Sequence, residues 1–99
     1  MPPRKGYTLR PAARRDMENI WLYSFETWSL QKADDYLRQL QNAFSALANG
    51  TKMGRDLRAV RSGYFSSTCN SHCIFYRKTA AGIVIVRILH QRMDPTRHL

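Results

Sequence analysis

Residues 11–50 read PAARRDMENIWLYSFETWSLQKADDYLRQLQNAFSALANG, and this stretch decides the fold of the chain. Apolar residues in its first part recur at the spacing of one helical face, which predicts a helix over 11–28 that begins at Pro11. Ser29 suits the N-cap of a second helix, and the Asn-Gly pair at 49–50 ends that helix. Because the link is so short, the two helices must form an antiparallel hairpin. The expected inward-facing residues are Ala13, Met17, Ile20, Trp21, Ser24 and Trp28 on the first helix, and Ala33, Tyr36, Leu37, Leu40, Phe44 and Leu47 on the second.

Strand-like runs lie on both sides of this hairpin in the sequence. The expected strands are 7–10, 58–69, 72–78 and 83–90, with a polar connector at 51–57. Gly63 should mark a bulge or bend, and 70–71 and 79–82 read as turns. The order of elements predicts a single α+β domain over 1–99, in which the helical hairpin packs on a mainly antiparallel four-stranded sheet.

Size and charge restrict the function. A chain of 99 residues with 43% hydrophobic residues can bury one core. The net charge of +9 is uneven: residues 1–50 carry +2 and residues 51–99 carry +7, which favours an anionic partner. No stretch approaches the roughly 18 apolar residues of a membrane span, and residues 1–15 lack the apolar core of a signal peptide. We therefore expect a cytoplasmic protein whose cysteines stay reduced.

The end of the chain resembles a known family. The segment YRKTAAGIVIVRILHQRMD (76–94), together with the helical hairpin and the order of elements, is similar to the ParE toxins of the RelE/ParE superfamily. The resemblance extends from about Tyr7 to Asp94. Its most specific part is ILHQRMD (88–94), a last strand followed by the His-x-Arg-Met-Asp signature typical of ParE.

This resemblance implies a type II toxin without enzymatic activity that inhibits DNA gyrase, through the A subunit. It also implies a ParD-like antitoxin, which pairs a ribbon-helix-helix DNA-binding dimer with an extended tail that wraps the toxin. The two proteins would form a hetero-oligomer that contacts DNA only through the antitoxin and represses its own promoter. The resemblance implies no cofactor, small-molecule substrate or membrane contact. The alternatives are a ribosome-dependent mRNA endonuclease of the RelE type and an interaction protein that has lost its toxicity.

The residues themselves argue against a ribonuclease, which needs an acid, a base and a cation for the phosphorane charge. The candidates are Tyr76, Arg77, Arg87, His90 and Arg92. Strict alternation puts Val84, Val86, Ile88 and His90 on one face of the last strand, and Ile85, Arg87 and Leu89 on the other. Arg87 would then point away from His90, unless a bulge intervenes, and could sit beside Arg77. No glutamate follows Glu26, so we expect a binding surface and no catalytic residue.

Two sets of residues are expected to bind protein partners. The target-binding set is Arg87, His90, Arg92, Met93 and Asp94, at the end of the last strand and in the tail. The antitoxin-binding set is Tyr23, Phe25, Trp28, Tyr36, Arg58, Arg61 and Arg77. Tyr23 and Phe25 fall outside the inward stripe of the first helix, which suits anchors for a partner. We expect the antitoxin tail to be acidic and amphipathic, so that it complements the basic second half of the chain. Independent DNA binding is not favoured, because no recognised DNA-binding module is present.

The segment CNSHC (69–73) raises the question of a metal site or a disulfide. Without a second, distant pair of ligands it is a weak zinc motif, so no metal site is expected. A two-residue turn would put Cys69 opposite His72 and Cys73 opposite Thr68, so that the thiols face opposite sides of the sheet. A three-residue turn would instead place the two cysteines opposite each other. We expect two unlinked cysteines.

Overall fold

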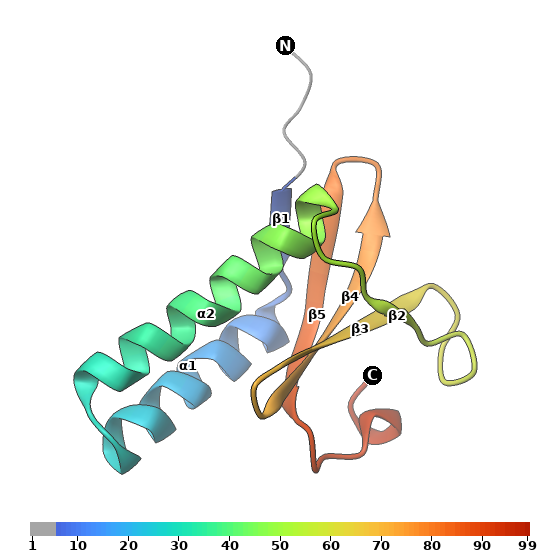
Figure 1. Ribbon diagram of the computed structural model, residues 1–99. Coiled ribbons are helices and arrows are strands. Elements are labelled where there is room, and N and C mark those ends of the chain that lie inside the picture. Colours follow the sequence, from blue (N-terminus) through green and yellow to red (C-terminus); the bar gives the residue numbers. More distant parts are fainter. Residues whose placement is uncertain (1–5) are drawn as a thin grey trace.

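A helical hairpin lies against one side of a twisted sheet in the computed structural model, which describes residues 6–99 (Figure 1). In chain order the elements are β1 (Gly6–Leu9), α1 (Pro11–Thr27), α2 (Leu30–Asn49), β2 (Arg55–Asp56), β3 (Tyr64–Cys69), β4 (His72–Thr79), β5 (Gly82–His90) and a short 3₁₀ helix η1 (Pro95–Arg97). The predicted α+β class and the order of the helices and main strands are therefore confirmed. Within residues 6–99, no helix is long and apolar enough to cross a membrane.

The strands form one mixed sheet in the order β1-β5-β4-β3-β2. β1 runs parallel to β5, and the other neighbours are antiparallel. The sheet has five strands rather than the expected four, because Arg55 and Asp56 of the polar connector pair with β3. The strand expected from residue 58 begins only at Tyr64, since residues 57–63 fold as turns that close with a bond from Leu57 N to Tyr64 O. Gly63 lies in this turn region with φ of 83°.

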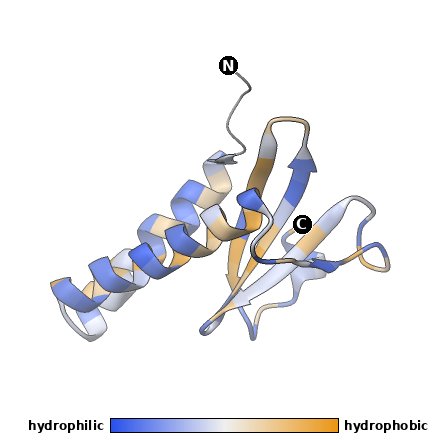
Figure 2. Ribbon diagram, turned by 45° about the horizontal axis from the view of Figure 1, so that its top comes forward, coloured by the Kyte–Doolittle hydropathy of each residue, from blue (hydrophilic) through white to orange (hydrophobic). Residues whose placement is uncertain are grey.

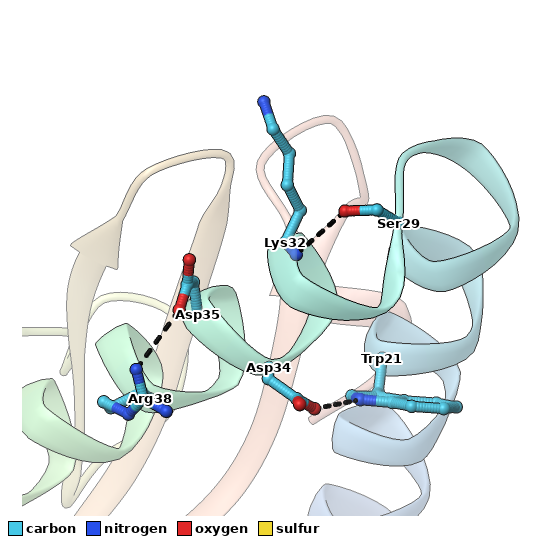
Figure 3. A network of polar contacts seen from close by, with 6 residues as sticks. All are labelled: Trp21, Ser29, Lys32, Asp34, Asp35 and Arg38. Atoms are coloured by element: carbon cyan, nitrogen blue, oxygen red, sulfur yellow. Dashed lines mark hydrogen bonds and ion pairs between the residues drawn. The ribbon is translucent and has the colours of Figure 1, made fainter.

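Local capping signals set both ends of α2, as predicted. Ser29 Oγ accepts a hydrogen bond from Lys32 N at 3.1 Å at the start of α2 (Figure 3), and Gly50 ends the helix with φ of 85°. Trp21 of α1 donates from Nε1 to Asp34 Oδ1 of α2 at 2.9 Å, which ties the helices together (Figure 3). The hairpin is therefore held by a polar contact near its tip as well as by its apolar faces.

The main core lies between this hairpin and the sheet. Its most fully buried large residues include Leu40, Phe44, Ile74 and Ile85. Figure 2 shows β5 as the most apolar strand, whereas the last residues of β4 are hydrophilic. Of the expected inward stripe of α1, Ala13, Met17, Ile20 and Ser24 are buried, whereas Trp21 is only half-buried and the expectation fails at Trp28. That side chain is 65% exposed and lies just beyond the helix, which ends at Thr27.

A β-bulge changes the faces of β5. Tyr76 pairs with Ile85, but the preceding Phe75 pairs with Arg87, so Val86 is an extra residue in β5. As a result Ile85 and Ile88, three positions apart, both join the core under the helices. The strict alternation expected for this strand was therefore wrong.

The expected meeting of Arg77 with Arg87 was also wrong. Arg77 pairs with Val84, near the Thr79–Gly82 turn, whereas Arg87 pairs with Phe75, farther along both strands. The two arginines therefore lie at different positions along the sheet.

The turn between β3 and β4 agrees with the two-residue alternative. Asn70 has φ of 52°, Cys69 pairs with His72, and Thr68 pairs with Cys73. Both cysteines are free thiols. Because successive residues on a strand alternate faces, this register turns the two thiols to opposite sides of the sheet.

Candidate functional site

A large open cleft of about 1060 Å³ lies between the helical hairpin and one end of the sheet. One wall comes from α1, α2 and the short link between them, which contribute Tyr23, Tyr36 and Trp28, respectively. The other wall comes from the β3–β4 turn, the start of β4 and the end of β5, and the two strands contribute His72 and His90. Tyr23 and Trp28 are 68% and 65% exposed, so the rim of the cleft presents large aromatic surface to solvent.

Two histidines and a tyrosine form the polar centre of this cleft. β4 begins at His72 and β5 ends at His90, and the antiparallel register pairs these two residues directly. Their ring centroids are 5.4 Å apart. The Tyr36 hydroxyl is hydrogen-bonded to His72 Nδ1. On His90, Nδ1 accepts the backbone N–H of Arg92 at 3.2 Å.

The protonation of these groups follows from their surroundings. Burial lowers the pKa of His72, and the neighbouring His90 lowers it further. Burial also raises the pKa of Tyr36. Both side chains are therefore neutral near pH 7, and one hydrogen bond joins the Tyr36 hydroxyl to Nδ1 of the neutral His72 imidazole. The pair aligns α2 with the start of β4.

A second polar contact, between Asp16 and Arg87, joins α1 to β5. The Asp16 carboxylate accepts hydrogen bonds from Arg87 Nε at 2.7 Å, from Arg87 Nη2 at 2.9 Å and from the Ile88 backbone N–H at 2.9 Å. The side chains of Arg87 and Asp16 are only 22% and 11% exposed. This bonding raises the pKa of Arg87 above its already high value. The pairing of β1 with β5 ends where Leu9 meets Ile85, so Asp16 provides an acceptor for the Ile88 N–H, a donor of β5 that β1 does not reach.

The charges that line the cleft cancel. Asp16 and Asp35 balance Lys32 and Arg87, and the Lys32 ammonium lies 5.1 Å from the centre of the Trp28 ring. An electrically balanced cleft with an aromatic rim suits a protein segment better than a polyanion.

The target-binding set divides between the cleft and the surface. Arg87, His90 and Met93 line the cleft, although the guanidinium of Arg87 is already engaged by Asp16. Arg92 and Asp94 are exposed and lie outside the cleft lining. The carboxylate of Asp94 accepts from Thr96 N at 3.0 Å and caps η1.

The antitoxin-binding set divides as well. Tyr23, Trp28 and Tyr36 line the cleft, whereas Phe25 lies outside it and stacks on Trp21, with centroids 5.3 Å apart. The three arginines of this set, Arg58, Arg61 and Arg77, are on the β2–β3 loop and the far part of β4. That loop projects away from the hairpin tip, at the right of Figure 1.

Sequence reasoning singled out neither Asp16 nor His72 as a site residue. Asp16 had the weakest signal, since its partner Arg87 is 71 positions away. For His72 the signal was its place at the start of a strand, but pairing it with His90 required knowledge of the bulge at Val86. Among residues 6–99, no group of three or more His, Cys, Asp or Glu side chains could hold a metal ion.

Comparison with known proteins identifies the family. Residues 7–95 match the family model of the ParE toxin of the type II toxin–antitoxin system parDE. Toxin ParE1 of Mycobacterium tuberculosis (strain ATCC 25618 / H37Rv) is 42% identical over 94 residues, covering 94% of this chain and 96% of that protein. Toxin ParE1 of Caulobacter vibrioides is 37% identical over 95 residues, covering 96% and 98%.

Two solved structures share the fold. A chain of the chromosomal ParDE system from P. aeruginosa has a TM-score of 0.73 at 17% identity, covering 86% of this chain and 94% of that one. A chain of the RelBE2 toxin–antitoxin complex from Mycobacterium tuberculosis has a TM-score of 0.52 at 21% identity, covering 91% and 100%. The fold and the sequence matches agree, and the chain belongs to the ParE toxin family of type II toxin–antitoxin systems, within the RelE/ParE superfamily.

Proposed function

We propose that this toxin acts by binding DNA gyrase, through its A subunit, and that a ParD-like antitoxin neutralises it by occupying the cleft. One observation carries the proposal: residues expected to bind the antitoxin and residues expected to bind the target line the same cleft. They are Tyr23, Trp28 and Tyr36 from the first set and Arg87, His90 and Met93 from the second. A partner seated there would cover the target-binding residues directly. Both partners work in the cytoplasm, which is the proposed location of the toxin.

The chemistry of the cleft supports a protein partner. Tyr23 and Trp28 are large, exposed and amphipathic, and aromatic residues of this kind often dominate the binding energy of interfaces. The proposed complex is a hetero-oligomer in which the antitoxin supplies sequence-specific contact with operator DNA. The toxin itself needs no cofactor or small-molecule substrate for this role.

Gyrase activity provides the direct test. Purified toxin should inhibit supercoiling by gyrase and cause linear DNA to accumulate, and an equimolar amount of the antitoxin should abolish both effects. Reconstitution with A and B subunits from a resistant species, exchanged one at a time, would identify the subunit that confers sensitivity. Unchanged supercoiling at a large molar excess of toxin would contradict the gyrase proposal without affecting the antitoxin proposal.

Two matched variants test the cleft as the antitoxin site. Trp28→Ala removes an exposed aromatic from the cleft, whereas Phe25→Ala removes one from outside it. If Trp28 is a binding anchor, its loss should weaken antitoxin binding by about 2 kcal/mol, or roughly 30-fold in Kd. Phe25→Ala should leave the affinity within about threefold. Equal effects of the two variants in a calorimetric titration would show that the antitoxin does not use the cleft.

The mRNA endonuclease remains the alternative, because His72 and His90 lie in one cleft with Tyr36. Its charges argue against that reaction. The Arg87 guanidinium is paired with Asp16, and the cleft's remaining cation, Lys32, lies over an aromatic ring. The two histidine rings also contact each other edge to face, without space for a phosphate between them. Cleavage of mRNA on translating ribosomes that is lost in His72→Gln or His90→Gln, with gyrase unaffected, would favour the endonuclease.

A further inference from the structure

The positive charge of the chain is separated from the helical hairpin. Residues 11–49 carry four Lys or Arg against five Asp or Glu, whereas residues 50–99 carry nine against two. The excess therefore lies on the sheet, its loops and the tail. The cleft accounts for none of it, because its charged side chains balance.

The strand register gathers part of this charge on one face of the sheet. Arg77 pairs with Tyr64, and Arg55 pairs with Ser66. Directly paired residues share a face, and so do alternate residues of one strand, so Arg55, Tyr64 and Arg77 lie on the same side. Tyr76, next to Arg77, belongs to the core under the helices. This side of the sheet is therefore the one turned away from the hairpin.

A third arginine joins this face from the β2–β3 loop. The guanidinium groups of Arg61 and Arg77 both lie over the Tyr64 ring, 5.0 and 5.7 Å from its centre. The ring is only 6% exposed, while both arginines are exposed. Stacking on one buried ring thus holds two cations close together at the surface. We call Arg55, Arg61 and Arg77 the arginine face.

The arginine face has no internal counter-charge. In the part of the chain that the structure describes, none of its three arginines has a carboxylate within 4.0 Å. The nearby Asp56 is bonded to Arg58 instead. Like charges held in one place without a partner repel each other, and an anion bound between them would remove that repulsion.

We propose that the arginine face binds the phosphate backbone of duplex DNA without reading its sequence. A guanidinium offers two parallel donors that match a phosphate, and three of them on a sheet face suit a row of phosphates. The face offers no exposed ring for the bases of a single strand, because Tyr64 and Phe75 are 6% and 5% exposed. The exposed cleft aromatics that would anchor a peptide lie elsewhere, at the hairpin. This inference goes beyond the proposed function and does not require that gyrase be the target.

The test is the salt dependence of binding by the purified 99-residue chain. Fluorescence anisotropy with a labelled duplex of about 20 base pairs gives Kd over a range of salt concentrations. The slope of log Kd against the logarithm of the salt concentration is roughly 0.9 per phosphate contact. The triple variant Arg55→Gln, Arg61→Gln, Arg77→Gln should reduce that slope by about 2.7. If the three contacts contribute nothing to binding at 1 M salt, the Kd of the triple variant at 0.1 M salt should be a few hundredfold higher than that of the unchanged chain.

A control variant with the same net charge separates a local site from overall charge. Arg10, Arg14 and Arg15 are exposed at the start of α1, and changing all three to Gln also removes three positive charges. This control should keep the slope of the unchanged chain. An equal loss in both triple variants, or no loss in the arginine-face variant, would overturn the proposal.

Competition identifies the ligand. Unlabelled duplex should displace the labelled duplex at lower concentrations than single-stranded RNA or a polyglutamate peptide does. Preferential displacement by RNA or by polyglutamate would overturn the assignment to duplex DNA. If circular dichroism shows that the triple variant does not fold, Arg55→Gln alone is informative, because the contacts with the Tyr64 ring come from Arg61 and Arg77. Its slope should then fall by about 0.9.

Discussion

The contact between Asp16 and Arg87 gives a sharp prediction about stability. Asp16→Ala removes a carboxylate that accepts three hydrogen bonds, two from Arg87 and one from the Ile88 backbone. Removing one partner of a buried ion pair costs about 3–5 kcal/mol, because the remaining charge has lost its partner. Arg87 is 22% exposed and can be partly hydrated, so we expect the low end of that range, about 3 kcal/mol. For a chain of this size such a loss lowers Tm by about 15 °C.

Urea unfolding followed by circular dichroism measures this loss. The matched control is Asp35→Ala, which breaks the Asp35–Arg38 pair (Figure 3), whose Asp and Arg side chains are 50% and 67% exposed. Breaking such a pair should cost no more than about 0.5 kcal/mol. A double-mutant cycle with Arg87→Ala should give a coupling energy of about 2 kcal/mol. Two results would refute the view that this pair holds α1 against β5. One is a loss of unfolding free energy below about 1 kcal/mol for Asp16→Ala, and the other is a double variant whose loss equals the sum of the losses of the two single variants.

Three other features lead to expected outcomes. Burial lowers the pKa of His72, so below about pH 6.5 the unfolded chain binds more protons, and stability should fall from pH 7.5 to about pH 5.5. Urea unfolding of His72→Gln should show a flatter pH dependence. Gly82 has φ of 145°, and a Cβ there would collide with the backbone of Gly6, so Gly82→Ala should lower Tm by separating β1 from β5. Cys69 and Cys73 should both be alkylated after aerobic incubation, whereas a disulfide seen by mass spectrometry would require a different register.

Local signals were enough to predict the helices and the turn between β3 and β4. The N-cap Ser29, the left-handed Gly50 and the Asn-Ser turn at 70–71 act through neighbouring backbone groups, so a few residues of sequence specify each of them. β2 carried no comparable signal, because its Arg55 and Asp56 are polar. They become a strand only by pairing with β3.

The candidate site could not be predicted in the same way, because it depends on one extra residue in β5. Thr79 pairs with Gly82 across the turn, and unbroken pairing from there would place His72 opposite Leu89. The bulge at Val86 shifts the register by one residue and places His72 opposite His90 instead. Alternation alone contains no information about such a shift, which follows from the twist and packing of the whole sheet.

The cleft and the arginine face lie on different parts of the toxin, and this separation has a consequence for the toxin–antitoxin complex. If the antitoxin occupies the cleft, it covers exposed aromatics such as Trp28 and leaves Arg55, Arg61 and Arg77 free. The complex would then hold DNA by two kinds of contact, the specific contacts of the antitoxin and the salt-sensitive contacts of the toxin. Because only the second kind depends on the arginine face, its triple variant should weaken binding of the complex to operator and random DNA by the same factor. Specificity, measured as the ratio of the two affinities, should therefore stay unchanged while both affinities fall.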